Sequence, residues 1–332
     1  MIRLAVIVTS FLTSLVSLGF VSSASASFST AKELHSSGSF YYHQMQPAQP
    51  PDRSEKPDIE NEPSAVFILG GGPGFSSWNL EPVQQTLADL GHKTYLMDML
   101  GIGENRNQKP VQLLDSWVEQ IAQLKSTTSP NKPVILVAHS WGALMAMLYT
   151  RQHPEDVAKI ILLNPVDPLK QAMAQLTDDI HKRNSHEINA QWDDESAWEN
   201  VTDFNEADLE AVTLRQIQQV LPTYFLDYQQ GREYAEQFTI KDFNIDLNIQ
   251  AWKEYDAQPI LFSEINSWQK PLHFIECKQD YLMPHNLNAM QPNINLTSVD
   301  VIDQCGHFPW IEQPDTFRRT LSSYLNQAEE LL

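Results

Sequence analysis

Basic residues are scarce in this chain, which has 22 Lys and Arg against 42 Asp and Glu and a formal charge of −20. Clustered lysines and arginines are what bind phosphates, so neither nucleic acid nor an anionic membrane surface is an expected partner. A cationic small molecule, such as the free amino terminus of a short peptide, would be attracted by this charge. The charge has a second reading, since most acidic side chains on a surface face only water and serve solubility.

Cysteine is rarer still, with only Cys277 and Cys305 in 332 residues. No group of His, Cys and Asp residues has the spacing of metal ligands, and we expect neither a metal nor a cofactor. The chain is long enough for one large α/β domain with an inserted subdomain, and 42% of its residues are hydrophobic, enough for a substantial core.

Long apolar runs are missing after residues 1–26. That segment has Arg3 near its start, an apolar stretch over 4–20, and Ala24-Ser25-Ala26 at its end, which is the pattern of a signal peptide cleaved after Ala26. Serines and threonines dilute the apolar stretch and make a membrane-spanning helix unfavourable. We therefore expect export to the periplasm or the medium, without stable membrane insertion after cleavage. The oligomeric state stays open.

The most informative segment is a β-branched, apolar run over residues 133–138 that leads into His139-Ser140 and then a helical pattern. With Ala138 and Gly142 as small residues on either side, this is the strand–turn–helix context of a nucleophile elbow. The turn would lift the Ser140 hydroxyl clear of the sheet, in front of a helix N-terminus that stabilises an anion. The alternative is an ordinary turn with a buried serine. The His139 side chain is expected to point away from Ser140 and to be structural.

A glycine-rich segment, Gly70-Gly71-Gly72-Pro73-Gly74, follows the strand expected at 65–69. Glycines let a backbone amide approach a substrate closely, because no Cβ stands in the way. In an acyl-transfer enzyme the amides of Gly71, Gly72 and Trp141 would form an oxyanion hole. Phosphate binding is not expected, since the segment lacks the Lys-Ser/Thr of a P-loop and the spacing of a dinucleotide fingerprint.

Asp280 and His307 each follow a further expected strand, at 271–277 and 298–302. Serine, acid and histidine thus occur in the order Ser140, Asp280, His307, as they do in α/β-hydrolases. In such a triad His307 accepts the serine proton and later donates it to the leaving group, while Asp280 orients the imidazole. His285 is expected at a helix start and ranks behind His307.

Together these motifs resemble those of prolyl iminopeptidases, serine aminopeptidases of the α/β-hydrolase superfamily that release an N-terminal residue. The resemblance spans about residues 65–325 and rests on Gly70–Gly74, Asp98-Met99-Leu100-Gly101-Ile102-Gly103, Ala138–Gly142, and Gly306–Trp310 with Glu312-Gln313-Pro314. It implies a mostly parallel central sheet flanked by helices, with an inserted, mainly helical cap. Three positions depart from the family pattern. Gly70 replaces a histidine, Ala138-His139 replaces Gly-Gly, and Asn105 stands where serine is common.

The order and spacing of the expected helices and strands divide the chain into five segments. The segments are a signal peptide at 1–26, an N-terminal edge strand and Pro-rich loop at 27–64, a core at 65–166, a helical cap at 167–270 and the rest of the core at 271–332. Strands near 65–69, 93–98, 133–138 and 159–164 alternate with helices near 81–90, 111–125 and 142–152, which predicts a parallel sheet covered by helices. Residues 27–45 are expected to hold a short helix and then an edge strand around 39–44.

Two parts of the cap resemble the elements with which iminopeptidases bind the substrate amine. Trp198-Glu199 matches the first, and Thr223-Tyr224-Phe225, with Asp227 and Glu233 nearby, matches the second. Which of the last two carboxylates faces the pocket stays open. A buried carboxylate facing an ammonium group contributes ~1.5–3 kcal/mol. The alternative is that the aromatic residues form the core of the cap and the acids are solvated.

The two cysteines flank the expected acid and base. Since Asp280 and His307 must come within hydrogen-bond reach, Cys277 and Cys305 are forced close as well, and export permits a disulfide between them. The alternative is two buried thiols that act as small apolar side chains.

Three functions remain in view. The first is an exported serine aminopeptidase of prolyl iminopeptidase type that releases an N-terminal residue through an acyl-enzyme on Ser140. The second is a carboxylesterase acting on small acyl esters. Ala138-His139 in the elbow and the missing histidine of the Gly-rich loop favour this alternative. The third is a non-catalytic binding protein with the same fold, against which the intact triad argues. The side chain preferred at the N-terminal position stays open.

Overall fold

A single eight-stranded sheet forms the centre of the computed structural model, which describes residues 32–48, 63–168, 182, 206–261, 264, 267–268, 270–282 and 298–326. The strand order is β1-β2-β4-β3-β5-β6-β7-β8. Strands β3 to β8 are parallel, whereas β1 and β2 pair antiparallel with their neighbours. The bounds are β1 Glu33–Ser36, β2 Tyr41–Met45, β3 Val66–Leu69, β4 Thr94–Leu96, β5 Val134–His139, β6 Val157–Leu163, β7 Leu272–Cys277 and β8 Ser298–Ile302. The mostly parallel sheet predicted from the sequence is confirmed.

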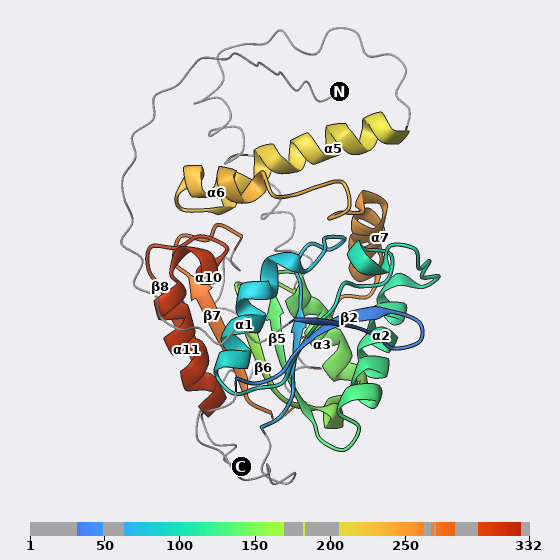
Figure 1. Cartoon of the computed structure of the whole chain (residues 1–332), viewed down its shortest axis with the longest axis vertical. Helices are drawn as coiled ribbons and strands as arrows, with labels where there is room; N and C mark the ends of the chain where they lie inside the picture. The colour runs from blue at the N-terminus through green and yellow to red at the C-terminus, as the bar shows by residue number, and fades with distance from the viewer. Residues whose placement is uncertain are drawn as a thin grey trace, which may run out of the picture.

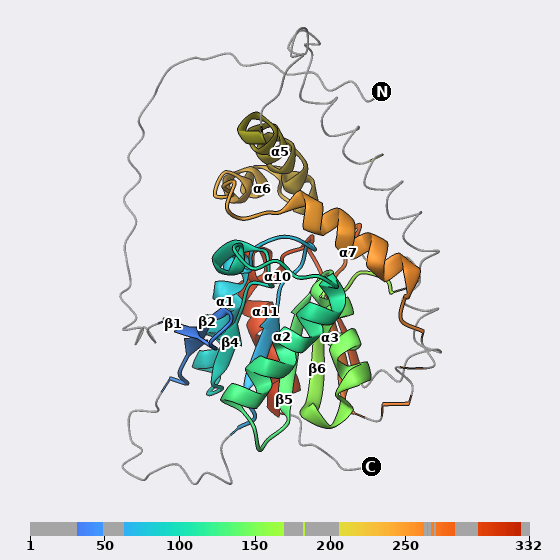
Figure 2. The same ribbon diagram turned by 90° about the vertical axis from the view of Figure 1, so that its right-hand side faces the viewer.

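Helices cover both faces of this sheet (Figures 1 and 2). Helices α2 (Leu113–Thr128) and α3 (Gly142–Gln152) pack on one face, and α1 (Glu81–Asp89) and α11 (Pro314–Asn326) pack on the other. Because successive side chains of a strand point to opposite faces, β5 serves both cores: Leu136 belongs to the first and Val137 to the second. All six residues of β5 are therefore buried, which explains its continuous apolar run.

The N-terminal segment differs from the expectation. Residues 33–36 form strand β1 rather than a helix and pair with β2 as a hairpin. Gly38, at φ +69°, lies in the connection, where a left-handed backbone favours glycine. Backbone pairing along the sheet edge prevailed over helical propensity here.

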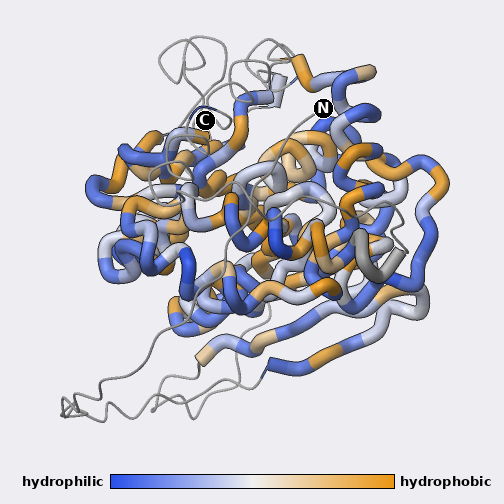
Figure 3. The backbone as a smooth tube through the Cα atoms, turned by 90° about the horizontal axis from the view of Figure 1, so that it is seen from above, coloured by the Kyte–Doolittle hydropathy of each residue, from blue (hydrophilic) through white to orange (hydrophobic). Residues whose placement is uncertain are grey.

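The insertion between β6 and β7 contributes α5 (Glu206–Val220), the 3₁₀ helix η5 (Leu221–Tyr224), α6 (Tyr228–Ala235) and α7 (Ile245–Ala257). These elements lie over the carboxyl ends of the parallel strands (Figures 1 and 2). Viewed from above, hydrophobic and hydrophilic stretches are interspersed along the backbone (Figure 3). In the parts of the chain that the structure describes, no helix combines the length and apolarity that a membrane span requires.

The start of α7 is bonded to loops of the core. Asn248 Nδ2 donates a hydrogen bond to the Pro73 carbonyl (2.6 Å), and Asn244 Nδ2 donates one to the Gly101 carbonyl (3.1 Å). A side chain at Gly74 would meet the Asn244 carbonyl oxygen at 2.6 Å, so only glycine permits this approach. The Gly-rich loop is thus held between the sheet and the insertion.

Candidate active site

Ser140 occupies a strained turn between β5 and α3. Its φ of +54° is left-handed, which a non-glycine residue adopts rarely and at a cost of order 1–3 kcal/mol. Its amide donates to the Leu163 carbonyl (2.9 Å), and its own carbonyl accepts from Ala143 (3.1 Å). Gly142 allows α3 to begin against β3, since a Cβ there would lie 2.6 Å from the Leu69 and Gly70 carbonyl oxygens. This is the backbone geometry of a nucleophile elbow.

Asp280 and His307 are joined by a buried hydrogen bond. His307 Nδ1 lies 2.7 Å from Asp280 Oδ2, and both side chains are shielded from solvent. A carboxylate only accepts, so Nδ1 donates and a neutral His307 keeps Nε2 unprotonated. Asp280 Oδ1 in turn accepts from the Leu282 amide (2.9 Å). An imidazole held in this tautomer is what a general base for a serine hydroxyl requires.

The His139 ring, predicted to be structural and to point away from Ser140, lies against His307 and its neighbours. Its centroid is 4.5 Å from that of His307, 5.5 Å from that of Phe308 and 4.7 Å from that of Trp310. The residue that precedes Ser140 in the chain therefore packs directly on the proposed base.

Asn164, which sequence reasoning took only as the end of a strand, connects the acid and base loops. The residue is buried and has φ +42°. Its Nδ2 donates to Asp280 Oδ2 (2.7 Å) and to the Gly306 carbonyl (3.2 Å). The available signal was an amide side chain directly after a wholly apolar parallel strand, at the edge where ligands bind in such sheets.

Glu312, which the sequence marked only as part of a family motif, anchors the loop of the base. Its carboxylate accepts from the amides of Gly306 (2.9 Å), Phe308 (3.3 Å) and, in the insertion, Leu226 (2.8 Å). The His307 amide donates to the Tyr224 carbonyl (2.8 Å). The loop of the base is therefore fastened to the segment that joins η5 to α6.

Tyr224, predicted to bind substrate, lies beside His307. Its ring centroid is 5.8 Å from that of His307 and 5.6 Å from that of Tyr281. Burial, and then the charge of Asp280, raise the pKa of Tyr224 to about 12, so its hydroxyl remains protonated at neutral pH. The structure thus brings this aromatic residue to the proposed base.

The other predicted cap residues have different outcomes. Asp227 is the N-cap of α6 and accepts from the amides of Gln229 and Gln230 (2.9 and 3.2 Å), so its carboxylate is occupied by helix capping. Glu233 lies on the exposed face of α6, within 3.2 Å of the Gln229 side chain. Asp227 thus caps a helix and Glu233 faces solvent, and a role of either carboxylate in binding the substrate amine stays a prediction. Trp198 and Glu199 lie outside the described residues.

The predicted oxyanion hole brings Gly71 close to Ser140. A Cβ on Gly71 would lie 2.9 Å from the Ser140 Cβ, so no other residue permits this approach. Trp141 is the N-cap of α3, and its buried side chain packs on Trp117 and Trp252. Gly72, at φ +132°, is exposed at the outer part of the loop. The backbone of Gly71 and the start of α3 therefore flank the serine.

Asp98, the first residue of the motif Asp98–Gly103, bonds to the segment that follows the Gly-rich loop. Its Oδ1 accepts from the Ser77 amide (2.6 Å) and its Oδ2 from the Glu104 amide (3.0 Å). Its carbonyl accepts from Asn105 Nδ2 (2.7 Å), and the Asn105 side chain also bonds both backbone groups of Tyr41. Asn105, which departs from the family pattern, therefore connects the Asp98–Gly103 motif to β2.

Cys277 and Cys305 form a disulfide in the structure. Their Cα atoms are 5.2 Å apart, and both residues are fully buried. Cys277 ends β7 and Cys305 lies two residues before His307, so the bond ties the loop of the acid to the loop of the base.

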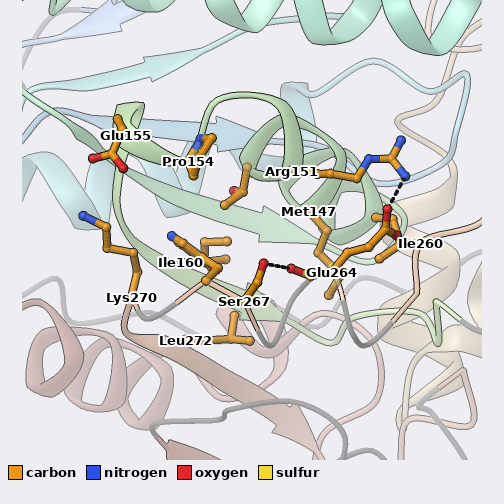
Figure 4. A pocket seen from close by; sticks show the side chains of 12 residues that line it. Met147, Arg151, Pro154, Glu155, Ile160, Ile260, Glu264, Ser267, Lys270 and Leu272 are labelled. Atoms are coloured by element: carbon orange, nitrogen blue, oxygen red, sulfur yellow. Dashed lines mark hydrogen bonds and ion pairs between the residues drawn. The ribbon is translucent and has the colours of Figure 1, made fainter. Parts of the chain in front are cut away.

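A cavity of about 550 Å³ lies elsewhere, beside the end of α3 and the start of β7. Figure 4 shows Arg151 paired with Glu264 on one side of it and Glu155 and Lys270 on the other. None of the predicted site residues lines it. Among the residues described, no three His, Cys, Asp or Glu side chains are grouped as metal ligands would be.

Comparisons with known proteins agree with this fold. The family model described as "alpha/beta hydrolase fold" matches residues 64–314. A proline iminopeptidase of Heyndrickxia coagulans is 23% identical over 288 residues, which cover 82% of this chain and 94% of that protein. A proline iminopeptidase-related protein of Thermus thermophilus has a similar fold, with a TM-score of 0.62 at 17% identity over 90% of this chain and 98% of that one. A thermophilic esterase of Thermogutta terrifontis does too, with a TM-score of 0.59 at 14% identity over 90% and 99%.

The structural similarities, at these low identities, bear on the fold alone. The family match covers most of the chain, and together with the iminopeptidase relatives it confirms the predicted resemblance. The chain belongs to the α/β-hydrolase family.

Proposed function

We propose that this protein is a serine hydrolase, and specifically an aminopeptidase of prolyl iminopeptidase type that acts on short peptides. The observation that carries the proposal is the buried 2.7 Å hydrogen bond between Asp280 and His307, next to a serine in a left-handed turn. A serine hydroxyl is a weak nucleophile near neutral pH, and this arrangement supplies the base that activates it.

The proposed mechanism assigns a role to each of these groups. His307 accepts the Ser140 proton through Nε2 as the serine attacks the scissile carbonyl, and the resulting imidazolium is stabilised by Asp280. The oxyanion is stabilised by the backbone amides of Gly71 and of Trp141, which lies at the start of α3. His307 then protonates the leaving amine, and water releases the N-terminal residue from the acyl-enzyme.

Aminopeptidase activity also requires recognition of a free amino terminus. The similarity to proline iminopeptidases, at 23% identity, and the acidic composition of the chain support an aminopeptidase. Glu199 is our candidate for the carboxylate that binds the ammonium group, on the strength of the sequence match alone. Export, with cleavage after Ala26, remains part of the proposal.

A carboxylesterase that cleaves small acyl esters is the second candidate. It is favoured by His139 in the elbow and by glycine at position 70, where iminopeptidases have histidine. Both activities use the same triad, so they differ in substrate rather than in chemistry.

The test is an assay of purified protein against aminoacyl-naphthylamides and p-nitrophenyl esters of graded acyl length. An aminopeptidase cleaves the prolyl or small apolar aminoacyl amides and loses activity when their amine is acetylated. An esterase cleaves only the esters. Ser140→Ala must lose both activities and its labelling by a fluorophosphonate, and full activity in that variant would refute the proposal.

A further inference from the structure

His139 is enclosed within the candidate site although the proposed reaction does not use it. It is the last residue of β5, is 2% exposed, and precedes Ser140 directly. Its ring is surrounded by those of His307, Phe308 and Trp310. The polar atoms of a buried imidazole are expected to have hydrogen-bond partners, so the surroundings of each ring nitrogen are described in turn.

The Nε2 atom of His139 lies 3.0 Å from the carbonyl oxygen of His307. A carbonyl only accepts hydrogen bonds, so Nε2 carries the proton and donates. The Nδ1 atom is buried and has no hydrogen-bond partner among the described residues. Protonation of Nδ1 would create a buried cation next to a second imidazole. Burial first, and then the neighbouring His307, hold the pKa of His139 well below its usual range, which keeps the ring neutral.

The bond from His139 completes a set of three that fix His307. The His307 amide donates to Tyr224 (2.8 Å), its ring donates to Asp280 (2.7 Å), and its carbonyl accepts from His139. Of these three partners, only His139 is the direct chain neighbour of Ser140. It therefore relates the backbone of the base directly to that of the nucleophile.

The same ring also contacts the Gly-rich loop. A Cβ on Gly71 would lie 3.2 Å from His139 Nδ1, so the loop rests on the unprotonated edge of the imidazole. A larger or differently shaped side chain at position 139 would displace either this loop or the loop of the base.

We propose that His139 is a positioning residue, which as a neutral imidazole protonated at Nε2 holds His307 and the Gly71 loop in register with Ser140. The inference rests on the proposed function, in which Ser140 and His307 carry the reaction. His139 itself touches no reacting atom. Its contribution is geometric, and a displacement of about 1 Å between catalytic groups costs about 100-fold in rate.

The test compares two variants of His139. In His139→Phe the ring remains but the donor is lost, whereas in His139→Gln the side-chain amide places a donor close to the position of Nε2. We expect the fluorophosphonate labelling rate and kcat to fall about 100-fold in His139→Phe with KM little changed, and to recover at least tenfold in His139→Gln. Since the bond is made by an uncharged ring, the acid limb of the pH–rate profile is expected to keep its midpoint in both variants.

The matched control is His273→Phe. His273 is fully buried on β7, stacks on Tyr324 and bonds Ser298 through Nδ1, so its replacement removes a comparable buried imidazole bond away from Ser140. We expect this variant to lose stability while its labelling rate stays within about twofold of the wild type. Equal labelling rates in His139→Phe and the wild type would overturn the inference, as would an equal loss in the Phe and Gln variants.

A measurement on the wild type guards against variants that fail to fold. In protein labelled with ¹⁵N-histidine, the His139 signals are expected to report a neutral ring protonated at Nε2 from about pH 6 to 9. A ring protonated at Nδ1, or a cation in this range, would overturn the inference. Failure of the proposed function is distinguishable from failure of this inference. Fluorophosphonate labelling of Ser140→Ala at the wild-type rate would show that Ser140 is not the nucleophile, but it would leave the tautomer of His139 unaffected.

Discussion

Glu276 provides the sharpest test of the energetics of this structure. It lies on β7 with no exposed surface, and within the described part of the chain neither oxygen of its carboxyl group has a hydrogen-bond partner. Burial, and then the charge of nearby Asp280, raise its pKa from 4.5 to about 7. The perturbation is Glu276→Gln, which keeps the shape of the protonated side chain and removes the titration.

The sign follows from proton binding. Between pH 4.5 and about 7 the folded chain keeps the Glu276 proton while the unfolded chain has released it. The folded state binds more protons in this window, so the free energy of unfolding falls as pH rises through it and levels off above it. A pKa difference of this size corresponds to about 3 kcal/mol. The wild type is therefore expected to lose about 3 kcal/mol relative to Glu276→Gln as pH rises from below the unfolded pKa to well above the folded one.

The assay is urea denaturation of both proteins across this pH range, with the difference in free energy of unfolding taken at each pH. Taking the difference cancels the titration of the histidines, which both proteins share. A difference that stays constant with pH would refute the argument, because it would mean that the Glu276 carboxyl titrates alike in both states. Glu254 is the control of opposite sign. Although burial acts to raise its pKa, hydrogen bonds from Gln250 and the amides of Leu114 and Leu113 lower it, so its contribution is lost as pH falls.

Three further predictions concern the site. Asn164→Ala removes a hydrogen bond to the Asp280 carboxylate, so kcat is expected to fall about 10- to 100-fold with little change in KM; steady-state kinetics check this, and an unchanged kcat would contradict it. Loss of the Cys277–Cys305 bond, which closes a 28-residue separation, is expected to lower stability by ~3–4 kcal/mol. Intact-mass analysis of alkylated, non-reduced protein shows whether the bond is present, and denaturation of Cys277→Ser with Cys305→Ser measures its effect. Glu199→Gln is expected to raise KM for substrates with a free amine and to leave neutral esters unaffected; equal losses on both would assign Glu199 a structural role.

The sequence alone determined those elements whose residue pattern is compatible with only one type of secondary structure and burial. Strands β3, β5 and β6 appear in the sequence as apolar runs because both of their faces are buried, and α1 and α2 appear as amphipathic helices because each buries only one face. Ser140, Asp280 and His307 were identifiable because each follows a strand and because their order is restricted in this fold. Gly142 and Gly71 were identifiable because close backbone approach excludes a Cβ.

Only the tertiary structure decided how side chains remote in sequence meet. Asn164, Glu312 and His139 bond or pack on groups more than 80 residues away or in another loop, and no local pattern marks such partners. Asp227 and Glu233 carry the same charge in the sequence as a substrate-binding acid would. Only the structure shows that the first caps a helix and that the second lies exposed on it, because the identity of a carboxylate does not determine where its helix places it.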